Sequence, residues 1–166
     1  MAALSGTGTL LAQAIRYALD SVADVTQTCL TRATPCAEWD VAALMCHVND
    51  SLAALHEGMA TGTIAPDPTE PTSYQTAYVL VDTFRDRADR LLAAATTLRR
   101  QGRLITIADR CTTESVVDAI GTVEIAVHGW DVATACGRDR PIPPDLAAAI
   151  RNVVPPVVVA DADQYP

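Results

Sequence analysis

The sequence predicts an all-α fold in which four long helices form an up-down-up-down bundle and a short extra helix follows at the C-terminal end. Four long stretches carry apolar residues at three- and four-residue steps, and each is bounded by capping or helix-stopping residues. Hydrophobic residues make up 49% of the chain but aromatic residues only 4%, so the core must consist of Ala, Leu, Val and Ile, which favours closely packed helices. A chain of 166 residues without internal repeats fits a single domain, residues 1–166.

The first predicted helix begins at Ser5 or Thr7, either of which can cap it, and runs to about Leu30. Its apolar positions recur mostly every three or four residues and form a stripe that faces the core. They are Leu10, Ile15, Ala18, Val22, Val25 and Cys29. Pro35 then stops helical structure in the loop TRATPCAEWD.

The second predicted helix covers residues 41–60, with Asp40 as its N-cap. Gly62 and the proline-rich stretch IAPDPTEP end it and form a long surface loop. The capping-box spacing that begins at Thr72 starts the third helix, which runs to about Arg100. Its exposed face is rich in Asp and Arg, as is typical of a solvated helix face.

The stretch RLITIADRC is short, β-branched and alternating, so we expect it to be extended or to form a brief strand. Thr112 or Thr113 caps the fourth helix, and Gly137 is its expected C-terminal stop. A last short helix covers residues 146–153, and two consecutive prolines end it. The tail VVVADADQYP shows no clear structural pattern.

The net charge of −8 argues against nucleic acid or an anionic membrane as a partner. The N-terminal stretch lacks the basic region of a secretory signal, and no apolar run approaches the roughly 18 residues that span a membrane. Five cysteines without a CxxC spacing are typical of reduced thiols rather than of a disulfide framework or a thiolate zinc site. We therefore expect a cytoplasmic protein.

Glu124 and His128 are four residues apart within the fourth predicted helix, so their side chains lie about 40° apart on one face. A carboxylate and an imidazole placed this way can bind one divalent metal together. Glu124 is flanked by apolar residues, and burying its charge without a partner would be costly. A histidine such as His47, taken alone, is more often a hydrogen-bonded core residue. It is nevertheless the natural third ligand, because His56, nine residues later, faces the opposite side of the helix.

Two aspartates could support these ligands. Asp50 follows His47 by three residues, and Asp131 follows His128 by three residues. Either carboxylate could accept a hydrogen bond from an imidazole N–H group and orient the ring. Both positions fit helix-surface carboxylates equally well, and Asp131 could instead fix the end of its helix.

Two stretches resemble a known family. TPCAEWDVAALMCHV resembles the TPCxxWxVxxLxxHV segment of the mycothiol-dependent maleylpyruvate isomerase N-terminal family, which lies within the broader DinB/YfiT-like metalloproteins. EIAVHGWDVATACGR is similar to the second signature of that family, a Glu and a His on the last bundle helix followed by GWD and a glycine-arginine end. The two stretches cover about 30 residues in the correct order and spacing.

The resemblance implies a DinB-like four-helix bundle with a divalent metal, usually zinc, held by His47, Glu124 and His128. It also implies an isomerase or S-transferase that uses mycothiol, the cytosolic thiol of actinobacteria, as its cosubstrate. The sequence lacks the additional C-terminal domain of the isomerases, so maleylpyruvate itself is not the expected substrate. The chain stops soon after its last predicted helix, and a homodimer is one assembly that would supply the remaining wall of the pocket.

Three protein ligands leave one or two coordination positions open, which is typical of a catalytic metal site. The leading hypothesis is a zinc-dependent thiol transferase or isomerase that joins mycothiol or a similar thiol to a small electrophile. Asp50 and Asp131 are candidate catalytic residues, and Arg85 is a candidate for binding an acidic substrate group. One alternative is a metallohydrolase on the same site. The other is a non-catalytic module in which the metal staples the bundle and the pocket binds a ligand or a partner.

Overall fold

The computed structural model describes residues 7–37, 39–65, 75–97 and 103–162. The helices are α1 (Thr7–Val22), α2 (Val41–Thr61), α3 (Ala77–Thr97), α4 (Glu114–Ala135) and α5 (Pro144–Ala162), with a 3-10 turn, η1, at Gln27–Cys29. The strands are β1 (Thr63–Ile64), β2 (Leu104–Ile107) and β3 (Arg110–Thr113). None of the described helices is both long enough and apolar enough to cross a membrane.

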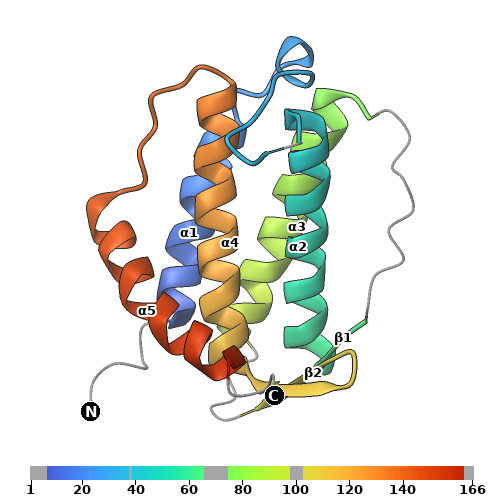
Figure 1. Cartoon of the computed structure of the whole chain (residues 1–166). Coiled ribbons are helices and arrows are strands. Elements are labelled where there is room, and N and C mark those ends of the chain that lie inside the picture. The colour runs from blue at the N-terminus through green and yellow to red at the C-terminus, as the bar shows by residue number, and fades with distance from the viewer. Residues whose placement is uncertain (1–6, 38, 66–74, 98–102, 163–166) are drawn as a thin grey trace.

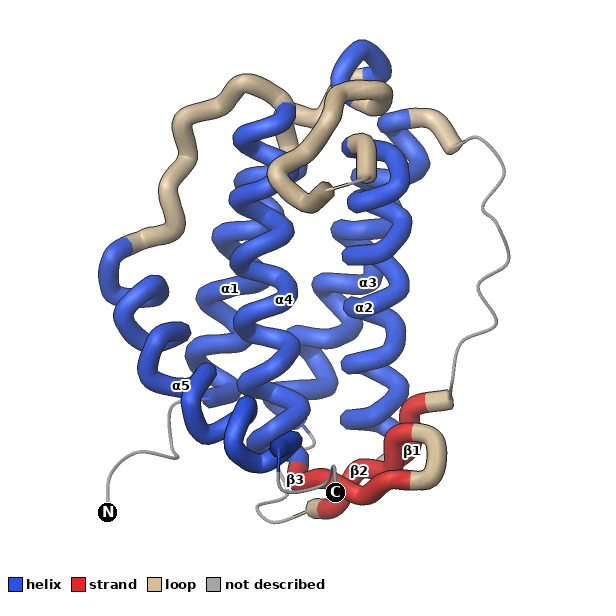
Figure 2. Tube along the Cα trace, viewed as in Figure 1, coloured by secondary structure: helices blue, strands red, loops and turns tan. Residues whose placement is uncertain are grey.

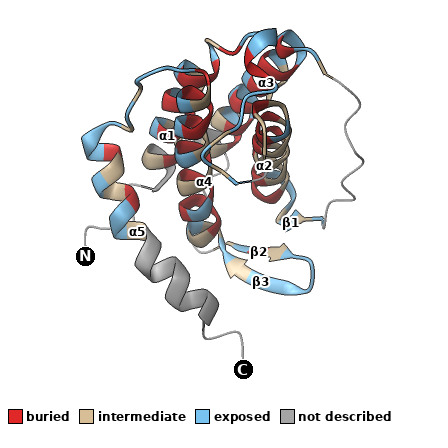
Figure 3. Ribbon diagram, turned by 45° about the horizontal axis from the view of Figure 1, so that its top comes forward, coloured by how far each residue is buried: buried red, intermediate tan, exposed pale blue. Residues whose placement is uncertain are grey.

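The predicted helical bundle is confirmed. The α4 helix packs against α1 and α2, the α3 helix packs against α2 and α1, and α5 crosses the outside of α4 and α1 (Figure 1). Buried residues line the inner faces of α1 to α4 (Figure 3). The fully buried core is aliphatic except for one aromatic ring, as the composition predicts, and includes Leu11, Ile15, Leu44, Leu52, Phe84, Leu91 and Ile125.

The predicted up-down-up-down order is wrong, because α2 and α3 run in the same direction. Asn49, in the first half of α2, donates from Nδ2 to the carbonyl of Leu80, in the first turn of α3, at 3.1 Å. The strands that follow these helices, β1 and β2, also pair in parallel. The end of α2 and the start of α3 therefore lie at opposite ends of the bundle (Figure 1). The connection at residues 65–76 can reach roughly 40 Å when extended, which exceeds the roughly 32 Å length of α2. A connection this long does not force an antiparallel pair.

The stretch expected to be extended forms the β2–β3 hairpin, and β1 adds a third strand beside β2 (Figure 2). Strand alternation buries Ile105 fully, whereas its neighbour Leu104 is 60% exposed. Arg103 donates from Nη1 to the Met59 carbonyl of α2 at 2.5 Å. The sheet thus closes the end of the bundle at which α2 finishes and α4 begins.

Several predicted helix caps are confirmed. Asp40 accepts a hydrogen bond from the backbone N–H of the third residue of α2, at 2.8 Å, and Gly62 ends the helix with a left-handed φ of 82°. Thr113 holds the predicted N-cap position of α4, but its side chain makes no hydrogen bond to the helix backbone. Gly137 follows the end of that helix with a φ of 73°. The backbone N–H groups of Gly137 and Arg138 donate to carbonyls in the last turn of the helix and form a Schellman motif.

The first helix is shorter than predicted. α1 ends at Val22, and η1 follows after a turn, whereas the apolar pattern predicted a helix to about Leu30. The turn brings the carbonyls of Leu30 and Arg32 to the backbone N–H groups of Ala42 and Val41, at 2.9 and 3.0 Å. These bonds satisfy backbone N–H groups at the start of α2 that have no partner within the helix. This contact between distant segments therefore outweighs the apolar spacing that predicted a helix to about Leu30.

Other helix ends also differ from prediction. α3 begins at Ala77, with the Thr76 hydroxyl group as its cap; the predicted boundaries at Ser5, Thr72 and Arg100 lie outside the described residues. α5 extends well beyond the predicted residues 146–153 and continues through the two prolines, so the tail is helical to Ala162, with residues 163–166 outside the described part. A proline ring fixes φ near its helical value, so a helix can continue through proline if it forgoes the missing N–H bonds.

Candidate metal centre

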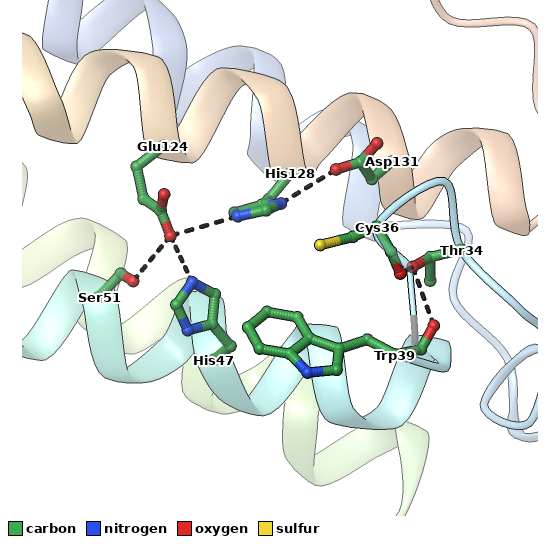
Figure 4. A network of polar contacts seen from close by, with 8 residues as sticks. All are labelled: Thr34, Cys36, Trp39, His47, Ser51, Glu124, His128 and Asp131. Carbon is green, nitrogen blue, oxygen red and sulfur yellow. Dashed lines mark hydrogen bonds and ion pairs between the residues drawn. The ribbon is translucent and has the colours of Figure 1, made fainter. Parts of the chain in front are cut away.

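Three side chains predicted as metal ligands meet between α2 and α4 (Figure 4). His47 Nε2 lies 2.5 Å from Glu124 Oε1, and His128 Nε2 lies 3.4 Å from the same oxygen. One ligand atom from each residue lies within 4.8 Å of the others. His56, also on α2, is not part of this group.

Close helix packing brings the three ligands together. The α4 helix has glycine where it meets each neighbour: a Cβ at Gly121 would lie 2.7 Å from Leu55 Cδ1 of α2, and a Cβ at Gly129 would lie 3.1 Å from Ala18 Cα of α1. A side chain at Gly129 would push α4 away from the α1 backbone, and a side chain at Gly121 would displace the Leu55 side chain of α2. The absence of a side chain at Gly121 therefore favours close packing of α4 on α2, where Glu124 contacts His47.

The candidate ligands fit a divalent metal. Two imidazole nitrogens and one carboxylate oxygen form a donor set that suits zinc. Tetrahedral zinc with ligands at about 2.1 Å holds neighbouring ligand atoms about 3.4 Å apart, which is the observed separation of the His128 and Glu124 atoms. The His47–Glu124 contact is shorter and would have to open. Both of these side chains are partly exposed, at 37% and 28%, so small adjustments and access by a small molecule are feasible.

The structure places Asp131 against the second nitrogen of His128. Asp131 is buried, and its Oδ2 accepts a hydrogen bond from His128 Nδ1 at 3.0 Å. A carboxylate can only accept, so His128 carries a proton on Nδ1, and Nε2 is the nitrogen that can give a lone pair to a metal. A hydrogen bond of this kind orients a metal-binding histidine.

Asp50 and Arg85 are placed differently. Asp50 Oδ1 accepts a hydrogen bond from Arg87 Nη1 of α3 at 3.0 Å, so this carboxylate ties α2 to α3. Arg85 is exposed on α3, a helix that packs on α2 and α1, whereas the three candidate ligands lie between α2 and α4. The arginine of α3 that reaches α2 is therefore Arg87.

Two further side chains at the centre were missed by sequence reasoning. Ser51 Oγ donates to Glu124 Oε1 at 3.1 Å. The Trp39 ring lies 4.6 Å from the His47 ring and 6.4 Å from the His128 ring, measured between centroids. Ser51 follows His47 by four residues, the same spacing that relates Glu124 to His128, so the helical period could have indicated it. Trp39 lies in a loop, where no such period applies.

The electrostatics of the centre favour an ionised Glu124. Burial alone raises the pKa of Glu124, but hydrogen bonds and charge interactions with His128 and His47 outweigh it and hold the pKa at about 2. Burial lowers the pKa of His128, yet its interactions with Glu124 and Asp131 outweigh burial and raise the pKa above its ordinary value. The carboxylate is thus ready to bind a cation at neutral pH.

The five cysteines are free thiols. The Cys36 side chain points toward the His128 side of the network (Figure 4), but Cys36 is not part of the candidate ligand group. Cys29 and Cys136 are buried and hydrogen-bond to each other, and burial is the main cause that raises the pKa of Cys136 to about 12. Cys136 therefore stays protonated at neutral pH.

Comparison with known proteins places the chain in a family. No curated protein and no solved structure matches it. A family model described as the mycothiol maleylpyruvate isomerase N-terminal domain matches residues 11–133, which run from α1 into α4 and include all three candidate ligands. Because this match covers well over half of the 166 residues, the chain belongs to the mycothiol maleylpyruvate isomerase N-terminal domain family.

Proposed function

We propose that the chain is a divalent-metal-dependent thiol transferase or isomerase, with zinc as the metal and mycothiol or a similar low-molecular-weight thiol as the cosubstrate for a small electrophile. The observation that carries the proposal is the convergence of His47, Glu124 and His128 in a member of a mycothiol-related family. The partial exposure of His47 and Glu124 gives a small molecule access to the three ligand atoms. The proposal places the reaction in the cytoplasm, where such thiols are kept reduced.

The ligand set suits the binding of an anionic sulfur. His47 and His128 bind as neutral imidazoles and Glu124 binds as a carboxylate, so a bound dication retains one net positive charge. A zinc ion held there supplies an open coordination position at which a thiol is acidified and presented to the electrophile. Asp131 holds His128 in the required tautomer, and the Trp39 ring covers one side of the His47 ring.

Cobalt substitution tests the proposal directly. The cobalt-loaded protein should develop an intense near-ultraviolet sulfur-to-cobalt band when mycothiol, or a simpler thiol at high concentration, is added. The zinc-loaded protein should conjugate the same thiol to a model electrophile. The His128→Ala variant should lose both signals, and the His56→Ala variant, with its substitution on α2 outside the ligand group, should retain both.

The alternative functions give different results. Absence of both the band and metal-dependent conjugation would refute thiol transfer. Ester or amide turnover without any added thiol would then support a metallohydrolase. If neither assay detects activity while zinc raises the melting temperature, the chain is a non-catalytic binding module stabilised by its metal. A ligand that binds only the folded state raises the stability of that state.

A further inference from the structure

The Ser51 hydroxyl group crosses the α2–α4 interface, unlike three other hydroxyl groups in the described helices. Ser21, Thr61 and Thr122 each donate to the carbonyl four residues earlier, at 2.9, 2.9 and 2.7 Å. This local bond is common for hydroxyl side chains within helices. Ser51 instead donates to Glu124 Oε1 at 3.1 Å (Figure 4). Its orientation therefore depends on the neighbouring helix.

Of the three contacts that Glu124 Oε1 makes, the hydrogen bond from Ser51 is the one that can persist when a metal is bound. The same oxygen contacts His47 Nε2 and His128 Nε2. A nitrogen that gives its lone pair to a metal carries no proton on that atom, so neither histidine can donate to Glu124 through Nε2 once it is a ligand. A serine hydroxyl group is not one of the usual protein ligands of zinc, so Ser51 keeps its proton.

We propose that Ser51 is a positioning residue for the carboxylate ligand: its hydroxyl group orients Glu124 so that the carboxylate meets the metal between His47 and His128. A glutamate side chain loses rotamer freedom when it is fixed, so a bond that already restricts the metal-free side chain favours metal binding. Hydrogen bonds to metal ligands commonly change metal affinity by about 10- to 100-fold. This inference rests on the proposed metal-dependent function and adds a determinant of metal affinity to it.

The test is the zinc dissociation constant of Ser51 variants, measured by competition with a chromophoric chelator. Ser51→Ala should bind zinc about 10- to 100-fold more weakly than the wild type. Ser51→Thr and Ser51→Val form a matched pair, because they have nearly the same shape and differ in the hydroxyl group. We expect Ser51→Thr to bind zinc more tightly than Ser51→Val by a similar factor. Ser21→Ala removes a buried hydroxyl group that bonds only within α1 and should leave zinc affinity unchanged.

A spectroscopic readout separates ligand positioning from general stability. The visible absorption of the cobalt-loaded protein reports ligand geometry, and it should change in Ser51→Ala and Ser51→Val but not in Ser51→Thr. Equal zinc affinities for Ser51→Thr and Ser51→Val, or a Ser51→Ala affinity equal to that of the wild type, would overturn this inference alone. A wild-type chain that binds no divalent metal would overturn the proposed function as well.

Discussion

His128 and Asp131 form a hydrogen-bonded pair on α4, with Nδ1 of the histidine donating to Oδ2 of the aspartate at 3.0 Å. The opposite ring nitrogen of His128 lies 3.4 Å from Glu124 Oε1. Because Asp131 keeps an imidazole proton on Nδ1, Nε2 is the nitrogen left to bind a metal at the candidate position. One continuous helix thus provides two of the three candidate ligands and the group that orients one of them.

Zinc content should depend on the three ligands and not on the remaining histidine. We expect about one zinc ion per wild-type chain, and a large loss in His47→Ala, Glu124→Ala and His128→Ala. His56→Ala is the matched control, because it removes an imidazole from α2 outside the ligand group. Elemental analysis after dialysis measures this. Full occupancy in both His47→Ala and His128→Ala would show that the ligand assignment is wrong.

Removing the carboxylate beside His128 should weaken zinc binding. Asp131→Asn retains the shape of the side chain but loses the charge that holds the His128 Nδ1 proton, so the zinc dissociation constant should rise about 10- to 100-fold. Asp50→Asn is the control: Asp50 also follows a histidine by three residues, but its carboxylate pairs with Arg87. Chelator competition on both variants provides the comparison, and equal effects would contradict a specific role for Asp131.

The stability of the metal-free protein should vary with pH through Glu124 and His128. The pKa of Glu124 is lowered from 4.5 to about 2, so its contribution is present above pH 4.5 and is lost as pH falls toward 2. The pKa of His128 is raised above 6.5, so its contribution is complete below pH 6.5 and is lost as pH rises through the raised value. The wild type should therefore exceed Glu124→Gln in melting temperature most strongly between pH 4.5 and 6.5.

Thermal unfolding in the presence of a chelator, across this range and on both sides of it, measures that difference. A gap between wild type and Glu124→Gln that is constant with pH would show that the histidine–carboxylate pairing does not contribute. The Glu57→Gln variant, which alters a carboxylate elsewhere on α2, should show no maximum in this window.

A large side chain at Gly129 should destabilise the bundle. The position has no room against the backbone of Ala18, so Gly129→Leu forces α4 away from α1 and should lower the free energy of unfolding by about 1–3 kcal/mol. In a chain of this size that corresponds to a fall of several degrees in melting temperature. Val127→Leu, at a position that is 37% exposed, is the control and should change little. Unchanged stability in Gly129→Leu would contradict the close α1–α4 contact.

The sequence by itself determined the features that depend on local geometry. Apolar residues at helical spacing predict the helices of the bundle, because the period of a helix is the same in any tertiary context. Asp40, Gly62 and Gly137 mark helix ends through their own backbone and side-chain properties. The side-by-side placement of Glu124 and His128 follows from a four-residue separation on one helix.

The tertiary structure decided the features that depend on which helix lies opposite. Asp50 and Asp131 each follow a histidine by three residues, yet Asp131 bonds to His128 while Asp50 bonds to Arg87 across the α2–α3 interface. The parallel direction of α2 and α3 is likewise not encoded by either helix, because a long connection permits both directions. Ser51 reaches its partner on α4 through helix packing. Which partner a side chain contacts depends on the free energy of the packed interface between helices. That interface forms only when residues distant in the sequence come together.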